Sequence, residues 1–147
     1  MGGERFGRFN EEAKRALLFT RAAISRFGGS TIESEHLAWG VIHAVPQVFE
    51  RFMAQEWSVD RIRDRLTEVM QRGPMVADSV EIPFTPAVDH ALREAIQIAD
   101  RLGRSDVRAE HLLLALLADE ASTCGQLLRG AGLNHERIVA YLIEHTA

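Results

Sequence analysis

The tripeptide Glu35-His36-Leu37 occurs again as Glu110-His111-Leu112, 75 positions further along the chain. At that offset, identical residues align without a gap between residues 9 and 117: Phe9 with Phe84, Ala16 with Ala91, Leu17 with Leu92, Arg26 with Arg101, Gly28 with Gly103 and Ser30 with Ser105. One extra residue in the second half then aligns Arg61-Ile62 with Arg137-Ile138. The sequence is therefore a tandem repeat of one structural unit.

Each repeat has apolar residues at three- and four-residue spacing, which is typical of amphipathic helices. Four helices are predicted in the first repeat, with the starts Asn10, Ser34, Pro46 and Ser58. Four are predicted in the second, with Thr85-Pro86 starting the first and apolar bodies at Leu112–Leu117, Leu127-Leu128 and Ile138–Ile143. Glycines at 28, 29 and 103 end the long first helix of each repeat.

The predicted architecture is one all-α domain over residues 1–147. The first repeat covers about 9–72, a connector about 73–83 and the second repeat about 84–145. The apolar faces are too wide for either repeat to bury alone, so we expect the repeats to pack with pseudo-twofold symmetry into one globule. The connector is not rich in Gly or Ser, and we expect it to lie across the body of the protein.

Composition excludes several classes of function. The net charge of −4 and the lack of a basic run argue against a nucleic-acid partner. No apolar run reaches the roughly 18 residues of a membrane span. The single Cys124 excludes an intrachain disulfide and fits a reducing compartment, so we expect a cytoplasmic protein and a plain buried thiol.

The motifs for catalysis and cofactor binding are incomplete. Residues 2–7 have the glycine spacing of a phosphate loop, but Arg8-Phe9 replaces the required Lys and Ser or Thr. An inverted zinc-protease motif would need histidine where Ile32 and Val107 stand. His36 and His111 lie in apolar helical runs, where a hydrogen-bonded core histidine is the ordinary interpretation. We therefore expect no cofactor, no metal site and no enzymatic activity.

Glu35 and Glu110 each open a helix, where the helix dipole stabilises an acid even in a protein with no ligand. The functional alternative is that free backbone N–H groups beside an acidic side chain hold a ligand that carries both signs of charge. The sequence alone leaves both interpretations open.

The doubled segments Phe9–Ala13 with Glu35–Leu37, and Pro83–Ala87 with Glu110–Leu116, resemble the double Clp repeat. This is the N-terminal domain of ClpC- and ClpA/ClpB-type Hsp100 unfoldases, and the resemblance is greatest to the ClpC branch. It covers roughly residues 4–145. The resemblance implies an all-α domain that receives protein substrates and adaptor proteins for a Clp/Hsp100 ATPase ring.

In ClpC-like members each repeat has a pocket for phosphoarginine, a degradation mark. A Thr at the first helix cap contacts the phosphate, and the Glu of the Glu-His pair binds the guanidinium. Carried over within each repeat, these roles pair Asn10 with Glu35 and Thr85 with Glu110. Arg108 adds positive charge to the second pocket and Glu33 adds negative charge to the first, so we expect the second to bind phosphoarginine more tightly.

The main hypothesis is a non-catalytic module that binds substrates or adaptors in the Clp quality-control and proteolysis system. One alternative is a stand-alone regulatory protein that docks on the Clp ring without binding substrate. A more distant one is a small hydrolase that uses a Glu-His pair. Adjacent helical residues point about 100° apart, which disfavours that pair as an acid–base couple.

Overall fold

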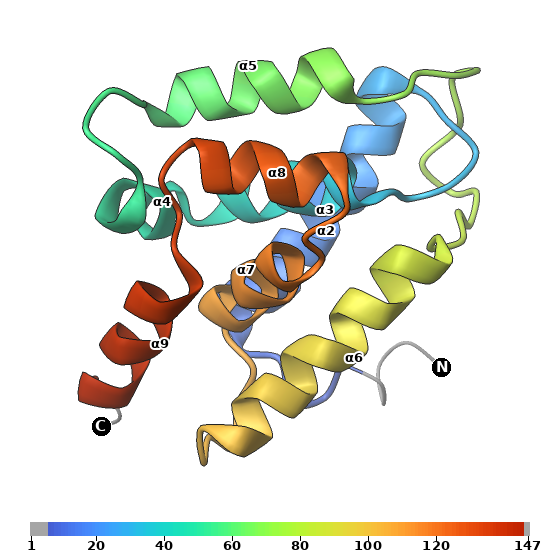
Figure 1. Cartoon of the computed structure of the whole chain (residues 1–147). Helices are drawn as coiled ribbons and strands as arrows, with labels where there is room; N and C mark the ends of the chain where they lie inside the picture. The colour runs from blue at the N-terminus through green and yellow to red at the C-terminus, as the bar shows by residue number, and fades with distance from the viewer. Residues whose placement is uncertain (1–5, 146–147) are drawn as a thin grey trace.

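The computed structural model describes residues 6–145, and that range contains eight helices and no strand (Figure 1). The first repeat contains α2 (Glu11–Phe27), α3 (Ser34–Ala44), α4 (Pro46–Phe52) and α5 (Val59–Val69). The second contains α6 (Pro86–Arg101), α7 (Ala109–Ala118), α8 (Thr123–Gly130) and α9 (His135–Glu144). The predicted all-α class and the two four-helix repeats are confirmed.

Side-chain caps start three of the helices at the predicted residues Asn10, Ser58 and Thr85. Asn10 Oδ1 accepts the Ala13 N–H at 2.9 Å, and Thr85 Oγ1 accepts the Val88 N–H at 3.3 Å. The expected cap at Ser34 is wrong, because Ser34 is already helical and Glu33 occupies the cap position. The reason lies in His36, whose ring accepts the Glu33 N–H and so starts the helix one residue earlier than a serine cap would.

The first two helices of each repeat form an antiparallel hairpin. Phe27 contacts Trp39 with 5.7 Å between ring centroids, and Phe19 contacts His43 at 4.5 Å, so residue numbers fall along α2 as they rise along α3. In the second repeat, the first turns of α6 share a surface cavity with the last residues of α7, Ala118 and Asp119. Each hairpin therefore places the starts of its two helices at opposite ends.

The pseudo-twofold relation between the repeats is visible in two isolated parallel β-bridges. Phe9 pairs with Val107, and Ile32 pairs with Phe84. Phe84 and Val107 are the residues 75 positions after Phe9 and Ile32, so the two bridges are the same contact with the repeats exchanged. The start of each repeat is thus held against the loop between the first two helices of the other repeat.

The core lies along α3 and α7, which occupy the middle of the molecule with the other helices around them (Figure 1). Both are apolar on nearly all sides, as their sequences predict. Phe49, Ile62, Leu92, Leu128 and Ile138 from the surrounding helices complete the main cluster. One continuous core therefore joins both repeats.

The connector lies across the body, as expected from its composition. The Arg21 guanidinium on α2 donates to the carbonyl oxygens of Ala77 at 2.9 Å and Val80 at 2.6 Å. Ser25 Oγ donates to the Asp78 carboxylate at 2.6 Å. These contacts fix a segment that has no helix of its own.

Replacing Arg21 with alanine should release the connector. Each lost hydrogen bond involves a charged donor, and such bonds are worth about 1.5–3 kcal/mol when buried and less when exposed. We expect a loss of about 1–2 kcal/mol in unfolding free energy and faster limited proteolysis between residues 74 and 82. Arg15→Ala, an exposed arginine on the same helix, is the control. Equal cleavage rates in the two variants would contradict this role of Arg21.

A second stability prediction concerns the close approach of α2 and α3 at Gly40. A Cβ atom there would lie 2.5 Å from the Ala16 carbonyl oxygen and closer still to Thr20 Oγ1. The equivalent residue of the second repeat is Ala115, so that hairpin accommodates the methyl group. Overpacking costs about 1–3 kcal/mol, partly offset by the higher helix propensity of alanine.

We therefore expect Gly40→Ala to lower the unfolding free energy by about 1–2 kcal/mol in urea titrations. Gly130→Ala is the matched control, because a Cβ atom at Gly130 meets nothing within 4 Å. That variant should be neutral or slightly more stable. Equal stability of the two variants would show that α2 and α3 separate without cost.

Candidate functional site

The two helix caps singled out in the sequence contact the opposite repeat. The Asn10 N–H donates to the Val107 carbonyl at 2.9 Å, one residue before Arg108. The Thr85 N–H donates to the Ile32 carbonyl at 3.0 Å, one residue before Glu33. Each cap therefore lies beside the loop that leads into the second helix of the other repeat.

The predicted pairing within each repeat is thus corrected by the structure. Asn10 and Glu35 lie at opposite ends of the α2–α3 hairpin, and a 17-residue helix such as α2 is about 25 Å long. Thr85 and Glu110 are separated in the same way along α6 and α7. The internal repeat shows which positions are equivalent. It does not show that the helix cap of one repeat lies beside the Glu-His motif of the other.

Two candidate sites result, and each combines residues from both repeats. The Asn10 site consists of Asn10 with Arg108 and Glu110. The Thr85 site consists of Thr85 with Glu33 and Glu35. Arg108 and Thr85, both assigned to one pocket from the sequence, belong to different sites.

Glu110 is the most unusual residue of the Asn10 site. Its side chain lies on the first turn of α7, and the residue is only 9% exposed. Among residues 6–145, no hydrogen bond or ion pair joins its carboxylate. The Glu110 oxygens are not among the buried side-chain atoms that lack a partner, so they reach solvent and can accept hydrogen bonds from a bound cationic group.

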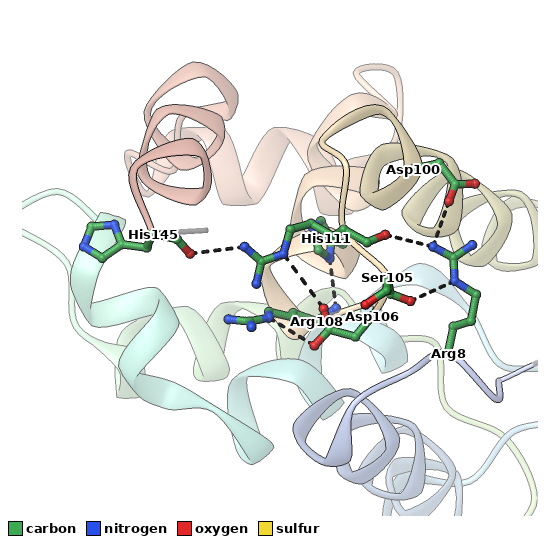
Figure 2. A network of polar contacts seen from close by, with 8 residues as sticks. Arg8, Asp100, Ser105, Asp106, Arg108, His111 and His145 are labelled. Carbon is green, nitrogen blue, oxygen red and sulfur yellow. Dashed lines mark hydrogen bonds and ion pairs between the residues drawn. The ribbon is translucent and has the colours of Figure 1, made fainter. Parts of the chain in front are cut away.

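A cluster of charged residues surrounds the same helix start (Figure 2). The Arg108 Nε atom lies 3.3 Å from the Asp106 carboxylate, and Arg104 Nε lies 3.9 Å from it. Arg8 pairs with Asp100 at 2.7 Å and donates to the carbonyl oxygens of Ser105 and Arg104. Arg8 could not be predicted because it is far from the second Glu-His motif in the sequence. Arg104 lies only six residues before Glu110, and its positive charge there was the available signal.

The histidines of the two Glu-His pairs are structural. The Nδ1 atoms of His36 and His111 accept the backbone N–H groups of Glu33 and Arg108, each at 2.9 Å. Both rings are buried, and their Nε2 atoms have no partner among the described residues. Burial lowers the pKa of each to about 4. The expectation of hydrogen-bonded core histidines is confirmed, and neither ring is exposed to act on a substrate.

The Thr85 site has the opposite electrostatic character. Burial raises the pKa of Glu35, a backbone hydrogen bond opposes this, and the charge of Glu33 raises it further. Cys124 on α8 is buried as expected, with its Sγ atom 3.7 Å from the Ser34 carbonyl. Burial raises the pKa of the thiol, and the charges of Glu35 and Asp119 add to that effect. An anion is therefore less favoured here than in the Asn10 site.

No group of three or more His, Cys, Asp or Glu side chains within residues 6–145 is arranged to hold a metal ion. None of the helices in that range has the length and apolar character to cross a membrane.

Clp proteins from bacteria and plants have sequences similar to this chain. The Bacillus subtilis negative regulator of genetic competence ClpC/MecB is 24% identical over 130 residues, which cover 88% of this chain and 16% of that protein. The Arabidopsis thaliana chaperone protein ClpC1, chloroplastic, is 25% identical over 139 residues, which cover 94% of this chain and 15% of that protein. The chain thus spans about a sixth of the length of these relatives.

Solved structures share the fold at lower identity. The N-terminal domain of ClpD from Arabidopsis thaliana superposes with a TM-score of 0.71 at 19% identity, covering 96% of both chains. The N-domain of ClpV from Vibrio cholerae gives 0.77 at 17% identity, covering 96% of this chain and 86% of that one. A ClpV N-domain in complex with a VipB peptide gives 0.72 at 20% identity, covering 98% and 88%.

The family model described as the Clp repeat (R) N-terminal domain matches residues 8–131, which include the helix starts of both candidate sites. The doubled Glu-His motif, the two four-helix repeats and the shared fold agree with that match. This chain belongs to the Clp repeat N-terminal domain family.

Proposed function

We propose that this domain is a non-catalytic module that binds protein substrates or adaptors for a Clp/Hsp100 ATPase ring, and that its Asn10 site recognises phosphoarginine. Family membership supports the first part, and the VipB peptide held by a ClpV N-domain shows that one related domain binds a peptide. The observation that carries the second part is the Glu110 carboxylate, which has no partner among the described residues and lies on the first turn of the helix that Arg108 precedes.

The chemistry of phosphoarginine matches the charges of this site. The ligand has a tetrahedral phosphoryl group on a planar guanidinium, so it offers anionic oxygens and N–H donors close together. The free N–H groups at the start of α7 and the Arg108 guanidinium favour the anion. The Glu110 carboxylate favours the cationic part through charge-assisted hydrogen bonds. An unmodified arginine or a phosphoserine supplies only one of these two features.

A peptide series tests the ligand assignment. One labelled peptide is prepared with phosphoarginine, arginine or phosphoserine at a single position, and binding is followed by fluorescence anisotropy. We expect the phosphoarginine peptide to bind at least about tenfold more tightly than the other two, because it alone makes both charge-assisted contacts. Absence of binding at millimolar phosphoarginine would rule out this ligand and leave the adaptor-docking role.

The partner assignment needs a separate experiment. The domain, tagged at its N-terminus, is used for pull-down from native lysate at native expression level. We expect an Hsp100 ATPase, its adaptors or Clp substrates among the captured proteins. Recovery of none of these classes would contradict the proposed role in the Clp system, whatever the outcome of the peptide series.

A further inference from the structure

Asp106 lies in the α6–α7 loop, two residues before Arg108, with its carboxylate between two guanidinium groups (Figure 2). One oxygen is 3.3 Å from Arg108 Nε and the other 3.9 Å from Arg104 Nε. The loop backbone is held on both sides of it. The Val107 N–H donates to the Arg8 carbonyl at 2.8 Å, and Arg8 Nε donates to the Ser105 carbonyl at 3.0 Å. The carboxylate is therefore held next to Arg108.

The first repeat has no counterpart of this arrangement. The residues 75 positions before Arg104, Asp106 and Arg108 are Gly29, Thr31 and Glu33. The charged cluster is thus an addition to the Asn10 site and not a consequence of the shared fold. It occurs where a ligand is independently indicated, because Glu110, two residues after Arg108, is only 9% exposed and its carboxylate has no partner among the described residues.

We propose that Asp106 competes with the anionic group of the ligand for Arg108, and that this competition sets the selectivity of the Asn10 site for phosphate over carboxylate. This inference rests on the proposed function of that site. Asp106 contacts Arg108 through Nε, and its negative charge competes with the ligand anion for the same guanidinium. A ligand carboxylate gains nothing over the carboxylate already in place, whereas a phosphoryl group brings greater charge and a third oxygen. The ion pair with Asp106 also disfavours the binding of acidic side chains to Arg108.

The test compares Asp106→Asn with Asp100→Asn, which removes the same charge from the Arg8 ion pair at the edge of the cluster. Inorganic phosphate and acetate are the probes, and the backbone amide NMR signals of residues 109–111 report binding. Removing a half-exposed ion pair should tighten phosphate binding about fivefold in Asp106→Asn, with less than about twofold change in Asp100→Asn. Acetate should bind measurably only to the Asp106 variant, and Asp106→Ser should behave like Asp106→Asn.

Equal affinities in Asp106→Asn and Asp100→Asn would overturn the inference, since the effect would then be one of net charge. An absence of amide shifts in the natural sequence and in all the variants would also overturn it, because no anion would then bind in competition with Asp106. A parallel titration with phosphoarginine separates the two proposals. If phosphoarginine fails to bind while Asp106→Asn still gains phosphate affinity, the proposed ligand is wrong and the competition by Asp106 stands.

Discussion

The unfolding free energy of this domain should fall by about 5 kcal/mol between pH 6.5 and pH 4 because of His36 and His111 alone. Both are buried, and burial lowers the pKa of each from an ordinary 6.5 to about 4 in the folded protein. Below pH 6.5 the unfolded chain therefore binds more protons than the folded one, and stability is lost as the pH falls. A shift of this size corresponds to about 3.4 kcal/mol for each histidine, of which about 2.6 kcal/mol is lost between pH 6.5 and pH 4.

The matched variant carries His36→Gln and His111→Gln. Glutamine at the third helical position can accept the same backbone N–H through its amide oxygen, but it does not titrate. Urea titrations from pH 7 to pH 4 should give a much flatter stability profile for this variant than for the natural sequence. His135→Gln, at an exposed position, should leave the profile unchanged. Parallel profiles for the natural sequence and the double variant would show that the buried rings do not control acid unfolding.

The helices could be predicted from the sequence because their signals are local. The caps Asn10 and Thr85 and the glycine ends lie within a few residues of the boundaries that they determine. The Ser34 cap failed for a reason that is also local, since a histidine can accept the N–H group that capping normally assigns to Glu or Gln at the same position. The twofold repeat could be predicted from the constant offset of 75 positions between identical residues.

The candidate sites could be predicted only in part. The alignment identified Asn10, Glu35, Thr85, Arg108 and Glu110 as positions, but the hairpins separate the members of each expected pair. Which cap meets which acid depends on how the repeats pack, and internal repetition carries no information on that. The role of Arg8 and Arg104 depends on the same contact between repeats.

The exchanged partners give the sharpest prediction about binding. Asn10→Asp keeps an oxygen that can cap α2 but replaces the amide donor with a negative charge, which disfavours a phosphate. Glu110→Gln removes the charge that holds the guanidinium. Each should weaken phosphoarginine binding about 10- to 100-fold, the value of one charge-assisted hydrogen bond. The equivalent changes at the Thr85 site, Thr85→Asp and Glu35→Gln, should change the affinity of the tighter site less than about threefold.

Calorimetric titration of the four variants, with thermal melting as a folding control, reads out the pairing directly. The titration should show a tight phase, which is binding to the Asn10 site, and a weaker second phase, which is binding to the Thr85 site. If the sites combine both repeats, Asn10→Asp and Glu110→Gln both lose the tight phase, whereas Thr85→Asp and Glu35→Gln affect only the weaker one. If each site belonged to one repeat, Asn10→Asp would instead group with Glu35→Gln. The tight phase should also weaken with added salt, since Arg108 is partly exposed and its attraction for the phosphate is screened. A tight phase that survives Glu110→Gln and disappears with Glu35→Gln would assign it to the Thr85 site, so that the hydroxyl cap and not the arginine would decide phosphate binding.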